Sequence, residues 1–341
     1  MKAVILAAGR GTRMLPLTEH RPKPLVPVAG RPILEHIVGG LASAGIDEVC
    51  LVVGWHGEQI EAHFGDGRRL GAHISYVWQS EYGGTGAAVL LAEDFVGEDR
   101  FVLGWGDILV PPCNYRRLMQ TFRAEQPEAM LAVNVVDDPW EGAAVYVRDG
   151  HVERIIEKPD RGTSSTNYNN AGLFVFGPEL IGTLKQTRVS SRGELEVPSA
   201  IGTLLEGGLR IRALEIDGYW SDVARPASAL AISGEVIAWM SHSGTIIHPE
   251  AHLAPGAEIK PPALIGPGAT IGSAVIGPNV TVMSGASVGS AARLSNACLM
   301  PNAAAGDGAQ LDWVFVEEGE QVAADARLAG SEAEARVVRG E

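Results

Sequence analysis

The feature that most constrains the fold is a six-residue periodicity of aliphatic residues after about Ser243. Aliphatic side chains recur at positions 253, 259, 265 and 271 and, after a slip of one residue, at 276, 282, 288 and 294. Glycine, proline and asparagine residues lie between them, and these residue types permit tight corners. The repeat predicts a parallel β-helix whose aliphatic side chains point into a narrow prism. A flexible Gly- and Ala-rich tail is the alternative that this periodicity disfavours.

The residues before Ser243 follow a different pattern, in which strand-like and helix-like stretches alternate. Apolar runs such as Val4–Leu6, Val49–Val53 and Phe101–Gly104 are separated by stretches with helical spacing, for example residues 33–44. This alternation predicts an α/β domain with a mostly parallel sheet. We therefore expect an α/β domain over residues 1–240, a β-helix over 241–320 and a charged tail or short helix over 321–341.

Composition excludes several classes of protein. The chain has 341 residues, 46% of them hydrophobic, and a net charge of −14. Such an acidic chain is a poor general ligand for nucleic acid or an anionic membrane, because its field repels phosphates. Its three cysteines are widely separated, which argues against a disulfide scaffold or a zinc knuckle. The first residues predict a strand, not a signal peptide, and no apolar run suits a spanning helix, so we expect a cytoplasmic protein.

A basic glycine loop near the N-terminus is the strongest functional signal. Gly9 and Gly11 follow a strand and let the backbone approach a phosphate closely, and Arg13 and Lys23 add cations. Residues 1–36 hold six basic and two acidic side chains, a net +4 within an acidic chain. Met14 occupies the place of the last glycine of a dinucleotide fingerprint, and the Gly-Lys-Ser/Thr of a P-loop is absent. The loop therefore predicts a different polyphosphate site.

The run from Gly9 to Arg13, followed by Pro22-Lys23-Pro24, resembles the signature of the sugar-1-phosphate nucleotidylyltransferases. The likeness covers roughly residues 1–235, and the family's motifs occur in order. It implies a Rossmann-like nucleotidyltransferase domain followed by a short left-handed parallel β-helix, as in the long glucose-1-phosphate thymidylyl- and uridylyltransferases. It also implies a role in nucleotide-sugar biosynthesis, with a nucleoside triphosphate and a sugar 1-phosphate as substrates.

The resemblance implies a role for each motif. Arg13 and Lys23 would stabilise the leaving pyrophosphate, and Lys158 would hold the sugar phosphate. Gly142, Glu157 and Asn170 would contact the sugar. Mg²⁺ would bind to Asp107 and Asp222, although Ala224-Arg225-Pro226 replaces the family's usual Gly-Thr-Pro after the second acid. The remaining residues implied in nucleotide binding are Leu6, Ala8, Gly9, Gly11, Thr12, Gln79, Gly84 and Thr85.

Some of these residues also have a purely structural interpretation. Gly84 and Thr85 could simply begin a helix, and Glu157-Lys158-Pro159 could be an exposed turn with an ion pair. Glu194, in a stretch that resembles the family's Glu-x-Glu loop, is expected to be structural. In the bifunctional members the β-helix carries an acetyltransferase with a catalytic histidine. Here His252 is the last histidine of the chain, so we expect the β-helix to serve assembly into a homo-oligomer or regulation.

The sequence leaves the exact substrates open. In the family that the chain resembles, the residues matching Gln79 and Gly84-Thr85 contact a pyrimidine base, so the resemblance favours UTP or dTTP. The glutamine amide can offer one donor and one acceptor to a base edge. A mannose-1-phosphate guanylyltransferase is the first alternative, because the stretch Arg21–Gly30 suits it equally. An inactive regulatory subunit that senses nucleotide sugars is the alternative from another class. Dimers, trimers and tetramers are all compatible with a β-helix.

Overall fold

The computed structural model describes residues 1–190 and 192–340, which form two compact units. One unit combines Met1–Arg10 with Leu34–Trp220. The other combines Gly11–Ile33 with the residues from Ser221 onward. The segment Gly11–Ile33 thus packs with the C-terminal residues, although strand β1 (Lys2–Ala7), just before it, belongs to the first unit. These units do not coincide with the segments 1–240 and 241–320 marked by the change in sequence pattern.

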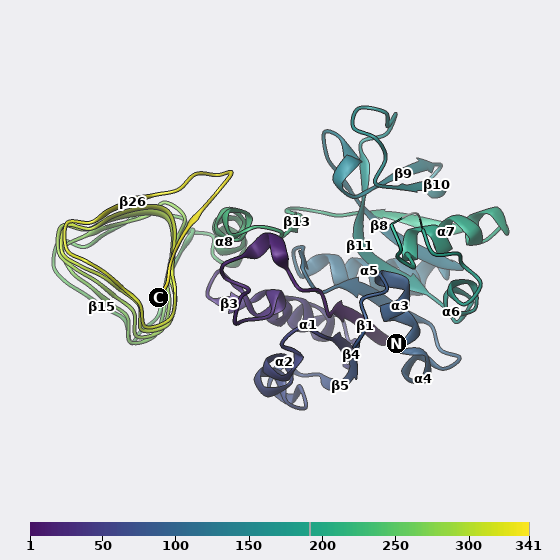
Figure 1. The fold of residues 1–341 in the computed structure, drawn as a ribbon, viewed down its shortest axis with the longest axis horizontal. Helices are drawn as coiled ribbons and strands as arrows, with labels where there is room; N and C mark the ends of the chain where they lie inside the picture. Colours follow the sequence, from purple (N-terminus) through teal and green to yellow (C-terminus); the bar gives the residue numbers. More distant parts are fainter. Residues whose placement is uncertain (191, 341) are drawn as a thin grey trace. The chain divides into compact units, whose positions relative to one another are not determined.

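A nine-stranded sheet forms the centre of the first unit (Figure 1). Its strands lie in the order β5 (His73–Trp78), β4 (Glu48–Val53), β1, β6 (Phe101–Trp105), β11 (Tyr168–Phe176), β8 (Ala129–Val135), β12 (Ile211–Glu215), β10 (His151–Glu157) and β9 (Ala143–Arg148). The first four strands are parallel to one another, as the sequence predicts. Beyond β6 the sheet is mixed, because β11 runs antiparallel to both β6 and β8.

Helices cover this sheet, and the first of them lies where the sequence predicts helical spacing over residues 33–44. They are α1 (Ile33–Ser43), α2 (Gly57–Phe64), α3 (Thr85–Leu90), α4 (Glu93–Val96), α5 (Cys113–Glu125), α6 (Glu179–Leu184) and α7 (Val197–Glu206). In α1 the buried residues Leu34, Ile37, Val38 and Leu41 recur at three- and four-residue intervals. In β1 the consecutive residues Ala3, Val4 and Ile5 are all fully buried, which is typical of a central parallel strand.

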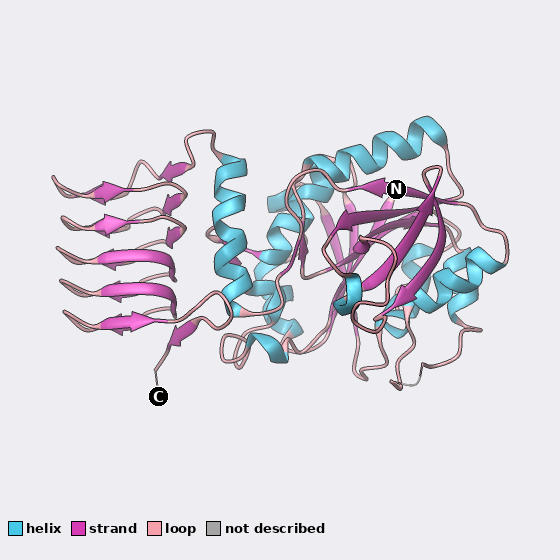
Figure 2. Ribbon diagram, turned by 90° about the horizontal axis from the view of Figure 1, so that it is seen from above, coloured by secondary structure: helices cyan, strands magenta, loops and turns pink. Residues whose placement is uncertain are grey.

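The second unit contains helix α8 (Pro226–Met240), the short hairpin of β2 (Pro27–Val28) and β3 (Arg31–Pro32), and a stack of parallel coils. Figure 1 shows the coils end-on as a triangle, and Figure 2 shows them stacked side-on. The ladder β15 (His252–Leu253), β18 (Thr270–Ile271), β21 (Ser287–Val288), β23 (Ala304–Ala305) and β25 (Gln321–Val322) contains five strands, one from each coil. This architecture fits a parallel β-helix.

The remaining strands build the other two sides of the triangle. One side holds β14 (Thr245–Ile247), β17 (Ala263–Ile265), β20 (Val280–Val282) and the later halves of β22 (Arg293–Leu299) and β24 (Gln310–Val316). The other holds β16 (Glu258–Ile259), β19 (Val275–Ile276) and the earlier halves of β22 and β24. The periodic aliphatic residues, including Ile265, Ile276 and Leu294, form the buried core of the stack.

The segment after residue 320 departs from the expected tail or helix. Besides β25 it forms β26 (Arg327–Ala329) and β27 (Arg336–Val338), and both of these pair in parallel with β24. A further coil explains this, since Val322 and Leu328 continue the apolar interior that the earlier coils began. Equivalent positions on the first coils are 17 or 18 residues apart, as in the pairs Ala263 with Val280 and Thr245 with Ala263. From Arg293 onward the registers through β26 are all 17 residues, so one step in three is five residues long there. That shorter step obscured the repeat after residue 294.

No helix in the described part of the chain is both long and apolar enough to cross a membrane.

Candidate active site

The carboxyl ends of the parallel strands bring three of the predicted motifs to one edge of the sheet. Strand β1 ends at Ala7 and leads into Ala8 and Gly9, while β6 leads through Gly106 into Asp107. Gln79 follows β5 directly and is 8% exposed. In open α/β sheets this edge is where ligands bind. The first unit therefore groups the start of the glycine loop, the glutamine and one of the two acids.

Two close backbone approaches hold this edge together. The N–H of Gly106 donates to the carbonyl of Leu6 at 2.8 Å, and a Cβ on residue 106 would lie 2.7 Å from the same oxygen. A Cβ on Gly54 would lie 2.8 Å from the carbonyl of Ala8. A side chain at either position would push β1 away from its neighbours. The glycines thus fix the position of Asp107 relative to the start of the loop.

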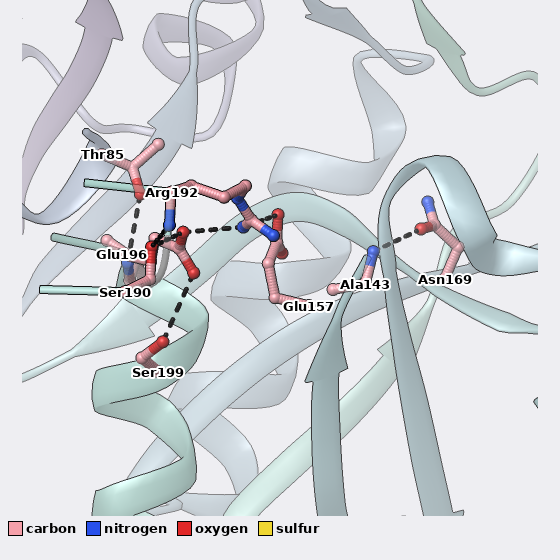
Figure 3. Close-up of polar contacts among 9 residues, drawn as sticks. Thr85, Ala143, Glu157, Asn169, Ser190, Arg192, Glu196 and Ser199 are labelled. Atoms are coloured by element: carbon pink, nitrogen blue, oxygen red, sulfur yellow. Dashed lines mark hydrogen bonds and ion pairs between the residues drawn. The ribbon is translucent and has the colours of Figure 1, made fainter. Parts of the chain in front are cut away.

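The Gly84-Thr85 loop is clamped by the backbone of Leu195. Gly86 N–H donates to the Leu195 carbonyl at 2.8 Å, and Leu195 N–H donates to the Gly83 carbonyl at 2.8 Å. The Thr85 hydroxyl accepts a hydrogen bond of 3.1 Å from Val197 N–H (Figure 3). Gly84 and Thr85 therefore begin helix α3, as their purely structural interpretation predicts, and their neighbours' hydrogen bonds fix the loop. A role for them in nucleotide binding remains a prediction.

The predicted sugar-binding motif is built around a second close approach. Lys158 has a φ of 44° and donates its N–H to the Gly142 carbonyl at 2.7 Å. A Cβ on Gly142 would lie 2.2 Å from Oδ1 of Asn169, which itself accepts from Ala143 N–H at 3.2 Å (Figure 3). Gly142, Glu157 and Lys158 are thereby brought together at the ends of β9 and β10.

Three buried asparagines form hydrogen bonds next to this motif. Asn134, Asn169 and Asn170 are 6%, 4% and 8% exposed. Asn169 Nδ2 donates to Asn134 Oδ1 at 3.0 Å, and Asn170 Oδ1 accepts from Gly172 N–H at 2.9 Å. Buried amides satisfied in this way hold the backbone rigidly. Asn170 thus fixes an irregular point of β11, where the register with β8 shifts before Phe174.

Glu157 lies in a pair of carboxylates bridged by an arginine (Figure 3). Arg192 Nη2 is 3.5 Å from Oε1 of Glu157 and 2.7 Å from Oε1 of Glu196. Burial raises the pKa of Glu157 to about 7; Glu196 and Glu194 act in the same direction, and Lys158 and Arg192 act against it. Glu157 is thus poised between its two protonation states near neutral pH.

Glu196 is the anchor of this cluster. Its side chain is 7% exposed, and Oε1 accepts hydrogen bonds of 2.7 Å from both the Ser190 hydroxyl and Arg192. The Ser199 hydroxyl donates to Oε2 at 3.4 Å. A buried carboxylate whose oxygens accept hydrogen bonds from three donors is held in one position. It therefore holds the Arg192 guanidinium against Glu157.

In the second unit, two cations of the glycine loop face Asp222. Lys23 Nζ is 3.3 Å from Oδ1, and Arg13 Nη2 is 3.7 Å from Oδ2. The Lys23 side chain is only 9% exposed, whereas that of Arg13 is 57% exposed. A buried ammonium is held in one place, whereas an exposed guanidinium retains freedom to move. Asp222 lies in the short strand β13 (Ser221–Asp222).

The loop itself is closed by contacts to Gly11. Gly11 has a φ of 63°, and its carbonyl accepts from Met14 N–H and from the Thr18 hydroxyl, both at 2.8 Å. A Cβ on residue 11 would lie 2.8 Å from Cβ of Lys23. Thr12 begins a single 3₁₀ turn, Thr12–Met14, that carries Arg13. These contacts hold Lys23 close to the start of the loop.

The predicted residues thus divide between the two units. Gly11, Thr12, Arg13, Lys23 and Asp222 belong to the second unit. The first unit holds Leu6, Ala8, Gly9, Gln79, Gly84, Thr85, Asp107, Gly142, Glu157, Lys158 and Asn170.

Each of the two predicted acids is the kind of donor that Mg²⁺ takes. Within residues 1–190 and 192–340, no group of three or more His, Cys, Asp and Glu side chains could hold a metal ion. Mg²⁺ is commonly held by one or two carboxylates together with substrate phosphates, so it does not require such a cluster. Asp107 and Asp222 are hard oxygen donors of this kind.

Sequence reasoning missed Arg192, Glu196 and Asn169. Arg192 and Glu196 flank Glu194, for which the sequence predicts a structural role, and Glu196 is the carboxylate that the fold buries. The acidic and basic residues of that stretch were visible, but nothing local showed which of them turns inward. Asn169 stands next to the predicted Asn170, and the double asparagine within an apolar strand was the available signal.

Comparisons with known proteins find a matching family model, curated relatives and a similar solved structure. A family model described as nucleotidyl transferase matches residues 2–237. The low-salt glycan biosynthesis nucleotidyltransferase Agl11 of Haloferax volcanii is 38% identical over 232 residues, which are 67% of this chain and 64% of that protein. A glucose-1-phosphate thymidylyltransferase of Streptomyces griseus is 36% identical over 238 residues, covering 70% of this chain and 66% of that protein.

A similar solved structure is that of a Bacillus anthracis protein named as a glucose-1-phosphate thymidylyltransferase, in complex with a sucrose. It superposes with a TM-score of 0.63 at 29% identity and covers 68% of this chain and 95% of that chain. The chain spans just under two thirds of the length of the two curated relatives above.

Proposed function

The chain belongs to the nucleotidyl transferase family, and we propose that it transfers a nucleotidyl group from UTP or dTTP to a sugar 1-phosphate, giving a nucleoside-diphosphate sugar and pyrophosphate. The observation that carries this proposal is the placement of Lys23 and Arg13 on Asp222. It is supported by the agreement between the motif order in the sequence and the matched family.

The reaction needs charge neutralisation and alignment more than a protein nucleophile. An oxygen of the sugar 1-phosphate attacks the α-phosphorus in line, a new P–O bond forms, and the bond to the β-phosphate oxygen breaks. The attacking phosphate is already anionic, so no general base is required. Catalysis then depends on holding the two anions together and stabilising the leaving pyrophosphate.

The cations of this chain are suited to these tasks. Lys23, buried and fixed, would offer a localised charge to the pyrophosphate, and the more mobile Arg13 would add a bidentate contact. Lys158 is exposed and would hold the attacking phosphate. Mg²⁺, bound by Asp107 and Asp222, would neutralise charge on the phosphates when it is present.

The sugar would be held at the ends of β9 and β10. The carboxylate of Glu157 can accept hydrogen bonds from sugar hydroxyls, with Gly142 offering its backbone and Asn170 fixing the strand beside it. Gln79 would offer the base a donor and an acceptor through its amide, and the matching family residues, which contact a pyrimidine, favour UTP or dTTP. We also propose that the coils form a left-handed β-helix and that the chain assembles into a homo-oligomer.

The first test is pyrophosphate release with Mg²⁺ from the full chain. UTP, dTTP, GTP and CTP would be crossed with glucose, N-acetylglucosamine, galactose and mannose 1-phosphates. Turnover with one pair that is lost in Asp107→Ala and lowered in Lys23→Met would support the proposal. Lys185→Met is the matched control, because Lys185 is exposed and pairs with Glu93.

The alternatives have distinct outcomes in the same experiment. Preference for GTP with mannose 1-phosphate would replace the pyrimidine assignment by guanylyl transfer. Nucleotide-sugar binding without turnover from any pair would refute the catalytic proposal and favour a regulatory sensor. Turnover that persists in EDTA would refute the role given to Mg²⁺ and to the two acids.

A further inference from the structure

The segment 11–33 packs with the C-terminal coils in one compact unit. This was not expected, because the glycine loop follows β1 directly. The proposed function places Arg13 and Lys23 of this segment at the leaving pyrophosphate. Whatever fixes the segment within its unit therefore also fixes those two cations.

Two ion pairs join the segment to the last coils. Arg21 Nη1 is 3.9 Å from Oε1 of Glu317 and 3.5 Å from Sδ of Met300, with side chains of Arg21 and Glu317 only 22% and 24% exposed. Glu19, two residues earlier, pairs with Arg339. Burial raises the pKa of Glu317, and Arg21 and Arg339 act in the opposite direction. The two pairs therefore form one electrostatic group.

Backbone contacts anchor the end of the segment to the same unit. The N–H of Ala29 donates to the Ser233 hydroxyl of α8 at 3.0 Å, and both residues are buried. Gly30, with a φ of 77°, would place a Cβ 3.3 Å from Leu264 of β17. The segment is thus held near its middle by side-chain charges and at its end by close packing.

The local sequence is suited to transmit this anchoring to Lys23. Pro22 lies between Arg21 and Lys23 and has a φ of −67°, which its ring fixes. Lys23 precedes Pro24, and a residue before proline has a restricted backbone. The Leu25 N–H donates to the Pro22 carbonyl at 2.9 Å, which closes the turn. Because few backbone dihedral angles separate the two residues, a displacement of the Arg21 backbone is expected to shift Lys23 as well.

From these contacts we infer that Arg21 is a positioning residue for the transfer reaction, and that the last coils of the stack hold the cationic loop in place through Glu317. The stack is then a structural part of the reaction centre and not only a module for assembly or regulation. This inference rests on the proposed function, because it is that function which gives Lys23 and Arg13 their role.

The test uses full-length Arg21→Gln and Glu317→Gln with the pair of nucleotide and sugar 1-phosphate that the pyrophosphate-release screen selects. Misplacement of a positioning group can lower turnover by up to about a hundredfold, so we expect kcat to fall by roughly ten- to hundredfold. The KM for the sugar 1-phosphate should stay within about twofold, since Glu157 and Lys158 belong to the first unit. Arg21→Lys keeps the charge and should recover part of the activity.

A double variant and a matched control separate positioning from folding. Arg21→Glu combined with Glu317→Arg restores the ion pair with its charges exchanged. The kcat of this double variant should be higher than that of either single charge reversal. Lys260→Gln removes a similar cation from the exposed pair with Glu258 and should leave kcat unchanged. If Arg21→Gln does not fold, Glu317→Gln carries the test, with its melting temperature measured beside that of the wild type.

Amide hydrogen exchange over residues 11–33 provides a readout that does not need turnover. We expect faster exchange of this segment in Glu317→Gln than in the wild type and in Lys260→Gln. Wild-type exchange together with wild-type kcat would overturn the inference. If no substrate pair is turned over by the wild type but the segment still exchanges faster, the anchoring stands and the proposed function fails.

Discussion

Replacement of Gly84 by alanine tests how the nucleotide loop is built. Gly84 has a φ of 90° and a ψ of 179°, a conformation that residues with a Cβ rarely adopt. A Cβ there would lie 2.5 Å from the carbonyl oxygen of Leu195 and 2.8 Å from Cβ of Glu194. Both distances are shorter than a van der Waals contact, and the nearest atom belongs to the backbone.

The expected cost follows from these two effects. Holding alanine in this backbone region costs about 1–3 kcal/mol. Moving Leu195 away stretches its two hydrogen bonds with Gly83 and Gly86, each worth about 0.5–1.5 kcal/mol. We therefore expect Gly84→Ala to lower the free energy of unfolding by about 2–6 kcal/mol, a large part of the 5–15 kcal/mol typical of folded proteins.

Urea unfolding followed by tryptophan fluorescence and circular dichroism measures this difference. The matched control is Gly182→Ala in α6, where a Cβ would have no heavy atom within 4 Å and φ is not positive. That change should be neutral or stabilise the protein by about 0.5–1 kcal/mol, because alanine is more stable than glycine inside a helix. A Gly84→Ala variant within about 0.5 kcal/mol of the wild type would refute the clamped loop.

Three further predictions concern the sugar site, the coils and the histidines. Because the pKa of Glu157 is raised to about 7, its carboxylate is lost as the pH falls through 7, and the KM for the sugar 1-phosphate should rise about tenfold between pH 8 and pH 6. A pH-independent KM, or the same profile in Glu157→Gln, would contradict this. Leu294→Ala, at a side chain 2% exposed, should cost about 2–5 kcal/mol in urea unfolding, and a smaller loss would mean that the prism is loosely packed. None of the nine histidines has a role in the proposed reaction, so replacing each by glutamine should not produce the roughly hundredfold loss of kcat that removal of a general acid or base causes.

The pH dependence of stability gives a second check on Glu157. Its folded-state pKa lies above its ordinary value of 4.5, so the folded protein binds that proton more tightly than the unfolded chain. Glu157 therefore lowers stability as the pH rises from about 4.5 to 7. Glu157→Gln should gain urea stability relative to the wild type over that range, and no gain would mean that Glu157 is well solvated.

The elements with strong local patterns were predictable from the sequence. The apolar runs near residues 4–6, 49–53 and 101–104 became β1, β4 and β6, and the helical spacing after Ile33 became α1. Aliphatic residues at six-residue intervals became the interior of the coils. Such patterns depend only on side-chain periodicity, which each element must satisfy to bury one face.

Features set by pairing between distant residues were not predictable. The sheet is mixed beyond β6 because β11, β8, β12, β10 and β9 are ordered by packing and not by their own sequences. The strands after residue 320 form because an apolar interior was available for them to cover. Their few aliphatic residues lie among many charged residues and alanines, so the sequence alone predicts a charged tail for this segment.

The order of the chemical groups along the chain can be assigned without the fold. The glycines, the cations and the acids of the proposed site can each be assigned from a local motif, because each motif needs only a few adjacent residues. The fold is needed to place Arg192 between Glu157 and Glu196 and to pack the loop that bears Lys23 with the last coils. Arg21 and Met300 are 279 positions apart, and no local pattern encodes a contact of that separation. Such a contact arises only when both segments bury their surfaces in the same unit.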